Sequence, residues 1–135
     1  MLFSDFAFVA IQTGGAETPD RVRSSVAFDL TGLDLRGRNL VTAVLHVHCP
    51  PAMTVRLTDP SGQSVYGCGR AGATAGVEVP LTIDALCDLE LAGGGFFALD
   101  AEFLSEAGDS RRVPREALAH PLVLTLEESV RLAAA

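Results

Sequence analysis

Apolar and polar residues alternate along most of this chain. From Val41 to Cys49 every odd position is apolar, whereas Thr42, His46 and His48 hold even positions. A period of two is that of a β-strand, whose successive side chains point to opposite faces. The alternation recurs in residues 22–30, 54–68, 77–91, 96–104 and 122–126, and an apolar stretch covers 3–11. About eight or nine short strands separated by turns predict an all-β fold, an antiparallel β-sandwich of the Ig-like or jelly-roll kind.

The phrase Asp59-Pro60-Ser61-Gly62 predicts a hairpin within residues 54–68. Asp at the first position, Pro at the second and Gly at the fourth are favoured in a type I turn. A left-handed Gly62, acting as a bulge, pairs Leu57 with Val65 and Arg56 with Tyr66. We predict this register because it sets apolar side chains opposite apolar ones.

The longest alternating stretch runs from Val77 to Leu91, and its odd positions are all apolar. Since this exceeds the common length of a strand, we expect two strands joined by a bend near Asp84–Leu86. The Gly93–Gly95 run then makes a tight turn into a strand over 96–104. The inward residues expected in that strand and the last one are Phe97, Leu99, Ala101, Phe103, Leu122, Leu124 and Leu126.

Little helix is expected. Residues 114–120 have room for one turn, and Thr125–Glu128 matches a capping box, although the box competes with the last strand. A short C-terminal helix is the most that so short a tail sustains without packing. Residues 14–20 are interpreted as a loop or hinge. The chain then divides into an N-terminal strand or arm (1–16), a β-sandwich domain (17–128) and a C-terminal tail (129–135).

Composition limits the classes of partner. The chain has 135 residues, enough for one domain, and a formal net charge of −7, with arginine as its basic residue. Because phosphate affinity rests on clustered cations, no nucleic-acid partner is expected. The acidic excess lies in residues 76–135, so a docking protein is expected to meet the more neutral first half. The sequence shows no secretory signal pattern and no membrane span, and a soluble chain without membrane contact is expected.

His46 and His48 are the strongest local candidates for a metal site. Two histidines at i and i+2 of a strand project to one side, as in β-sheet metal sites. His120 is the remaining histidine and Cys68 the best sulfur ligand. The alternative is a pair of solvent-facing or interface histidines, and we expect that no metal or other cofactor is bound.

The three cysteines do not predict a disulfide. They form no C-x-x-C pair, and strand parity points Cys49 and Cys87 inward and Cys68 outward, opposite Thr54. Two buried thiols and one exposed thiol fit folding in a reducing cytoplasm.

No residue pattern indicates catalysis. Asp100 and Glu102 share the outer face of one strand and resemble a carboxylate pair, but alternate outward carboxylates are also how an acidic strand stays solvated. The nucleophile-elbow, phosphate-loop and zinc-protease motifs are absent from the sequence. A non-enzymatic protein is therefore expected. The Arg111, Arg112 and Arg115 group lies among acidic residues and is interpreted as a solvated loop.

The order of segments resembles immunoglobulin-like domains in virion proteins of tailed bacteriophages. The matching phrases are Phe28–Gly32, the Leu57–Gly62 hairpin, Gly95–Asp100 and Ser105–Gly108, within residues 22–128. The resemblance implies a structural protein of a virion, folded in the host cytoplasm, as a tail or baseplate accessory or a capsid decoration protein. It further implies contacts with neighbouring structural subunits, as a homo-oligomer or symmetric assembly, through the N-terminal strand or C-terminal tail.

A ligand-binding jelly roll is the alternative function, with a carbohydrate or a metal as ligand. Carbohydrate-binding modules and the P-domains beside proteases share the Asp59–Gly62 kind of turn. Aromatic side chains are scarce, however, with Tyr66 the only tyrosine and no tryptophan, whereas sugar platforms rely on flat aromatic stacking.

Overall fold

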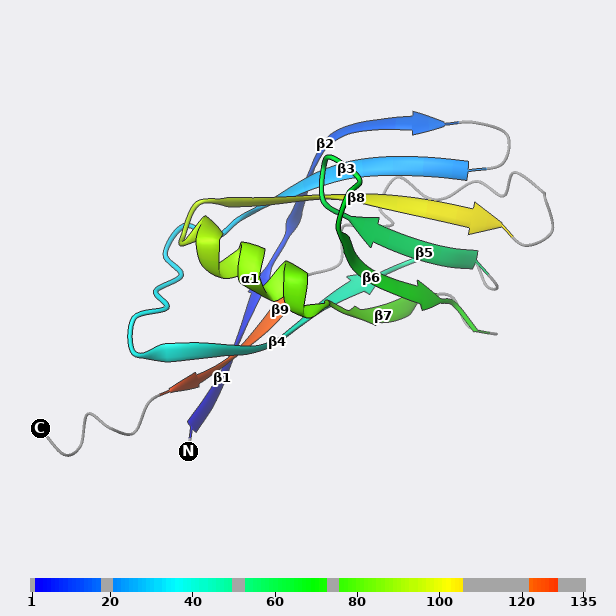
Figure 1. Cartoon of the computed structure of the whole chain (residues 1–135). Coiled ribbons are helices and arrows are strands. Elements are labelled where there is room, and N and C mark those ends of the chain that lie inside the picture. The colour runs from blue at the N-terminus through cyan, green and yellow to red at the C-terminus, as the bar shows by residue number, and fades with distance from the viewer. Residues whose placement is uncertain (1, 18–20, 50–52, 73–75, 106–121, 129–135) are drawn as a thin grey trace, which may run out of the picture.

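The computed structural model describes residues 2–17, 21–49, 53–72, 76–105 and 122–128. Nine strands and one helix lie within these ranges (Figure 1). Their bounds are β1 Leu2–Phe8, β2 Ala10–Glu17, β3 Arg21–Asp29, β4 Arg38–Val47, β5 Met53–Thr58, β6 Val65–Arg70, β7 Val77–Pro80, α1 Ile83–Ala92, β8 Phe96–Ser105 and β9 Leu122–Glu128.

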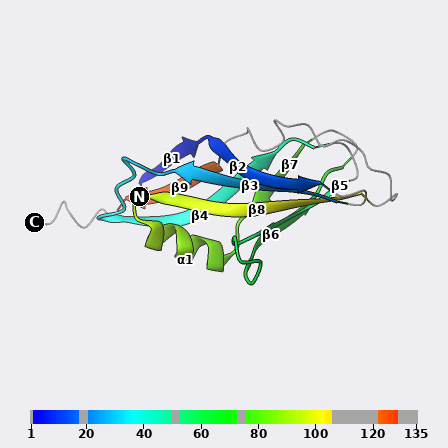
Figure 2. The ribbon, with the colours of Figure 1, turned by 90° about the horizontal axis from the view of Figure 1, so that it is seen from above.

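The strands form two antiparallel sheets that lie one above the other. Sheet A has the order β1-β9-β4-β7, and sheet B has the order β2-β3-β8-β5-β6. Figures 1 and 2 show the two layers, with α1 beside them on the side of β4, β6 and β8. The predicted antiparallel β-sandwich is confirmed, and every strand pair within each sheet is antiparallel.

The core lies between the sheets and consists mainly of the inward residues of β3, β4, β5, β8 and β9, joined by Ala85 and Leu89 of α1. The inward residues predicted for β8 and β9 are confirmed, since all seven are buried. In β4, Ala43, Leu45 and Val47 are buried, whereas Val41, also predicted inward, is 39 % exposed because a bulge interrupts the ladder between Leu40 and Thr42. Full burial of a Leu, Val or Phe side chain is worth about 1.5–3 kcal/mol, so this interior supplies the main stabilising free energy.

Residues 83–92 form a helix, and the prediction of two strands over 77–91 is wrong beyond β7. The Thr82 hydroxyl accepts a hydrogen bond from the Ala85 amide at 3.4 Å, and Gly93 ends the helix in the left-handed conformation with φ of 52°. The buried helix residues are Ala85 and Leu89, one turn apart. Apolar residues at every odd position are compatible with a strand and also with a helix that has apolar residues on two sides. The cap residues Thr82 and Gly93 favour the helix. This helix is an internal one that was not expected, and residues 129–135, where a short C-terminal helix was predicted, lie outside the described residues.

The predicted hairpin turn with a left-handed Gly62 is confirmed. Gly62 is left-handed with φ of 78°, and its amide donates to the Asp59 carbonyl at 2.9 Å. The predicted register is wrong, because Thr58 pairs with Val65, and a bulge then places Leu57 opposite Gly67.

The bulge at Tyr66 explains the changed register. It lets Tyr66 and Gly67 both lie buried, and the Tyr66 ring stacks on Phe97 with 5.3 Å between the ring centroids. Arg56 then lies opposite Cys68 instead of opposite the tyrosine. Burial of an aromatic ring outweighs the apolar pairing on which the predicted register rests.

The N-terminal stretch forms two strands that belong to different sheets, not one strand followed by a hinge. β1 pairs with β9 at the edge of sheet A, and β2 pairs with β3 at the edge of sheet B. Gly14 and Gly15 lie within β2, so the loop or hinge predicted for 14–20 is wrong at least for residues 14–17. The chain passes from one sheet to the other at Val9.

On the opposite side, edge strand β6 of sheet B lies against edge strand β7 of sheet A. A Cβ atom added to Gly67 would lie 2.8 Å from Val79 Cγ1 and 3.1 Å from the Pro80 carbonyl oxygen. Glycine at this position is therefore what allows the two edges to approach, and the close contact closes this side of the sandwich.

Candidate functional site

The outer face of sheet B, which points away from the core, has an apolar end and a charged end. The ladder places Ile11, Ala27 and Ala98 side by side on β2, β3 and β8. Two residues further on, Ser25 lies opposite Asp100, and the next outward row contains the Arg23–Glu102 pair of β3 and β8. Because outward positions alternate with buried ones, the strand period fixes which residues face outward, and the register between strands sets them side by side.

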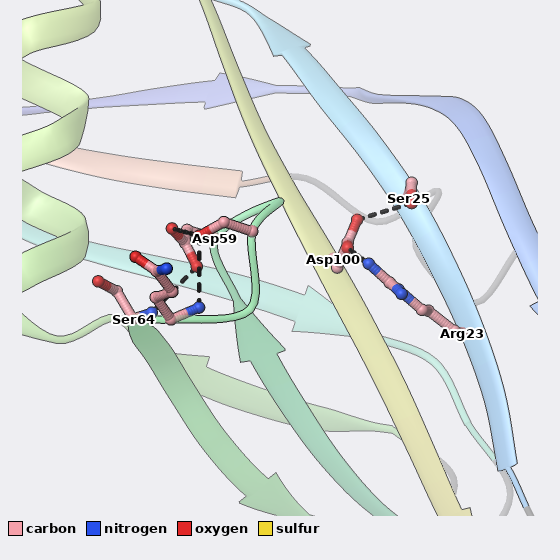
Figure 3. Close-up of polar contacts among 7 residues, drawn as sticks. Arg23, Ser25, Asp59, Ser64 and Asp100 are labelled. Carbon is pink, nitrogen blue, oxygen red and sulfur yellow. Dashed lines mark hydrogen bonds and ion pairs between the residues drawn. The ribbon is translucent and has the colours of Figure 1, made fainter.

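Asp100 is the centre of the polar network at the charged end (Figure 3). Arg23 Nε donates to Asp100 Oδ2 at 3.0 Å, Arg23 Nη2 donates to the same oxygen, and the Ser25 hydroxyl donates to Oδ1 at 2.6 Å. The hydrogen bonds and charge of Asp100 raise the pKa of the Arg23 guanidinium. The carboxylate is thus fully engaged by its own chain.

Asp100 is only 6 % exposed although it lies on the outer face. The expectation that it is a solvated surface carboxylate is therefore wrong, because neighbouring outward side chains cover it. Its two oxygens accept hydrogen bonds from Arg23 and Ser25. The described geometry therefore gives no support to a catalytic carboxylate pair of Asp100 and Glu102.

Four small or apolar side chains form what we call the apolar patch at the other end of the face. Its members are Ile11, Ala27, Phe96 and Ala98. The two large ones, Ile11 and Phe96, are exposed by 51 % and 65 %. Contiguous exposed apolar surface on one face is typical of interaction sites, unlike single apolar residues scattered over a surface.

The sequence contains a signal for this patch that the strand assignment did not use. Phe96 and Phe97 are adjacent in one strand, so one ring must point outward when the other points inward. The unbroken apolar run from Phe8 to Ile11 carries the same information for Ile11.

Two further polar contacts hold the hairpin in place. Asp59 accepts hydrogen bonds from the Ser61 hydroxyl at 2.6 Å and the Ser64 amide at 3.0 Å, and these lower the pKa of its carboxyl (Figure 3). The buried Tyr66 hydroxyl donates to Asp88 of α1 at 2.5 Å, and burial, followed by this bond, raises the pKa of the phenol. Both contacts are structural, since they join segments of the fold.

The structure describes two of the three candidate metal ligands, His46 and His48. His46 Nδ1 lies 3.6 Å from Glu78 Oε1, and His48 is exposed. His120 lies outside the described residues, as do Arg111, Arg112 and Arg115. Among residues with described positions, no three His, Cys, Asp or Glu side chains are grouped as metal ligands would be.

All three cysteines are free thiols. Cys49 is buried and Cys68 exposed, as predicted, and burial raises the pKa of the Cys49 thiol. Cys87 is exposed and its predicted inward position is wrong, because it lies on the outer side of α1. Cys68 lies opposite Arg56, not Thr54.

Helix α1, the only helix within the described ranges, is too short to cross a bilayer. Comparison with models of known protein families gives no match, and comparison with curated protein sequences gives none either. The function is therefore inferred from the fold and from the two ends of the sheet B face.

Proposed function

We propose that this chain is a non-enzymatic structural subunit that acts by docking on neighbouring protein subunits. The observation that carries the proposal is the exposure of large apolar side chains on three separate surfaces. Leu2 and Phe3 of β1 are exposed by 64 % and 57 %, and Ile83 and Leu91 of α1 by 72 % and 84 %. The apolar patch on sheet B is the third surface. Water-exposed apolar groups on several sides suit a subunit with several neighbours.

The described polar groups support the same function. Asp100, Asp59 and Tyr66 are each held in hydrogen bonds that join strands, turn and helix. Among the described side chains, no buried nitrogen or oxygen atom is left without a hydrogen-bond partner. A site built to bind a polar ligand or to move protons needs convergent groups with unused hydrogen-bonding capacity.

A bacteriophage virion is the setting that we propose for this subunit, as a tail or baseplate accessory or a capsid decoration protein. Its support is the sequence resemblance given above. In the Phe28–Gly32 phrase, Asp29 Oδ1 accepts from the Thr31 amide at 3.0 Å, which makes a compact turn after β3. The rival carbohydrate-binding function has less support, because the single tyrosine, Tyr66, is buried against Phe97 and offers no platform for a sugar ring.

Native mass spectrometry and sedimentation of the purified chain test the proposal. We expect self-association or association with a co-expressed neighbouring subunit, without bound metal. Detection in purified virions at a fixed stoichiometry tests the setting. A chain that stays monomeric and shows saturable binding on a glycan array, or that carries stoichiometric zinc or copper, contradicts the proposal.

A further inference from the structure

The outer face of sheet B is large enough for a stable protein interface. Strands of six to ten residues make up this sheet. With a rise of about 3.3 Å per residue and about 4.8 Å between strands, the face measures about 30 Å by 20 Å, or about 600 Å² in projection. Specific interfaces bury about 600–1,000 Å² on each partner. Helix α1, about 15 Å long, presents a much smaller stripe.

This face is also neutral within a strongly acidic chain. Its described charged side chains are Arg23, Arg56, Arg70, Asp29, Asp100 and Glu102, so the formal charge is 3 − 3 = 0, against −7 for the whole chain. Two copies of an acidic protein repel each other least where the local charge is zero. Elsewhere, α1 carries Asp84, Asp88 and Glu90 and no basic residue.

The apolar patch contains both large and small side chains, in separate positions. Ala27 and Ala98 lie side by side in its centre, Ile11 lies next to Ala27, and Phe96 lies two residues along β8 from Ala98. An inverted copy of the same face can therefore set its large side chains over the small ones, which is the self-complementarity that a twofold interface requires. Asp29 borders the patch, and its carboxylate already accepts from the Thr31 hydroxyl and amide.

We propose that the partner at this face is a second copy of the chain. The two outer faces of sheet B pack against each other so that the apolar patches meet and the charged ends lie at the border of the contact. This arrangement follows the usual anatomy of interfaces, in which charged residues are depleted at the core and retained at the edge. The inference deepens the proposed function and rests on it, because it names one of the neighbours.

Sedimentation and native mass spectrometry of the full chain and three variants test the dimer. Ile11→Arg and Phe96→Arg place a charge inside the proposed contact, and Val41→Arg is the matched control, since Val41 is also an exposed apolar strand residue but lies on β4 of sheet A, outside the three docking surfaces. We expect a dimer in the parent chain, at least tenfold weaker association in both patch variants, and none of this loss in the control. Because the face is neutral, raising the salt should not weaken the dimer.

Far-UV circular dichroism of each variant confirms that the fold is kept, and two patch variants guard against the failure of one to fold. A dimer or larger oligomer that survives both patch substitutions contradicts this inference and leaves the proposed function standing. A parent chain that stays monomeric up to about 1 mM also contradicts it. If that monomer also fails to bind a co-expressed neighbouring subunit, the proposed function fails with it.

Discussion

Truncating Leu89 and Leu91 to alanine, one at a time, is the sharpest test of the fold that places the site. Leu89 is 1 % exposed and belongs to the core, whereas Leu91, two residues later on α1, is 84 % exposed. A buried Leu→Ala change costs about 2–5 kcal/mol through lost transfer free energy and the cavity left behind. Because α1 lies at the side of the sandwich, where neighbours can partly relax, we expect about 3 kcal/mol for Leu89→Ala. Leu91→Ala should stay within about 0.5 kcal/mol of the parent.

Urea unfolding followed by far-UV circular dichroism measures both losses. With an m-value of about 2 kcal/mol/M, a loss of about 3 kcal/mol lowers the midpoint by about 1.5 M urea. In a strand over 77–91 both leucines would share the inward face. Similar losses for the two variants would therefore refute the helix, the exposure of Cys87 and the exclusion of Leu91 from the core.

Three further outcomes are expected. In the folded protein the exposed thiols of Cys68 and Cys87 should react at once with a thiol reagent, and Cys49 only on unfolding. A single fast-reacting thiol would mean that Cys87 is buried. Tyr66→Phe should cost about 1.5 kcal/mol in urea unfolding, because Asp88 loses its buried donor, and no loss would mean that this contact does not form. The lowered pKa of Asp59 makes its stabilisation present above about pH 4 and lost as the pH falls through the lower folded value. Asp59→Asn should therefore flatten the decline in stability below about pH 4, and an unchanged acid limb would contradict this.

Local sequence signals predicted the strands that alternate strictly between firm turns. Residues 96–104 alternate after Gly93–Gly95, and Gly93 and Gly94 both have positive φ, so turn and strand agree with each other. The hairpin turn was predictable for the same reason, since Asp59, Pro60 and Gly62 act within four residues.

Tertiary contacts decided the elements that the pattern predicted wrongly. The hairpin register depends on Tyr66, whose partners Phe97 and Asp88 are distant in sequence. The apolar pattern of residues 83–92 is compatible with a strand and with a helix, and packing against the rest of the fold decides between them. The helix forms, with Ala85 and Leu89 buried.

The site itself was only partly visible in the sequence. Outward parity places Asp100 on a face, but its partner Arg23 is 77 residues away, so neither the ion pair nor the burial follows from local spacing. The patch residues were readable as apolar positions of outward parity, yet their grouping needed the strand order β2-β3-β8, which joins the N-terminal segment to the late strand.

The passage of the chain from sheet A to sheet B at Val9 has a consequence for every shortened form of this protein. A single segment, residues 2–17, provides one edge strand of each sheet, β1 in sheet A and β2 in sheet B. Trimming from the amino end strips one layer first and, once past Val9, begins to strip the other. If a shortened version loses association, the first question is whether both of its sheets are still intact. Only then can the removed residues be assigned to a contact with a neighbour.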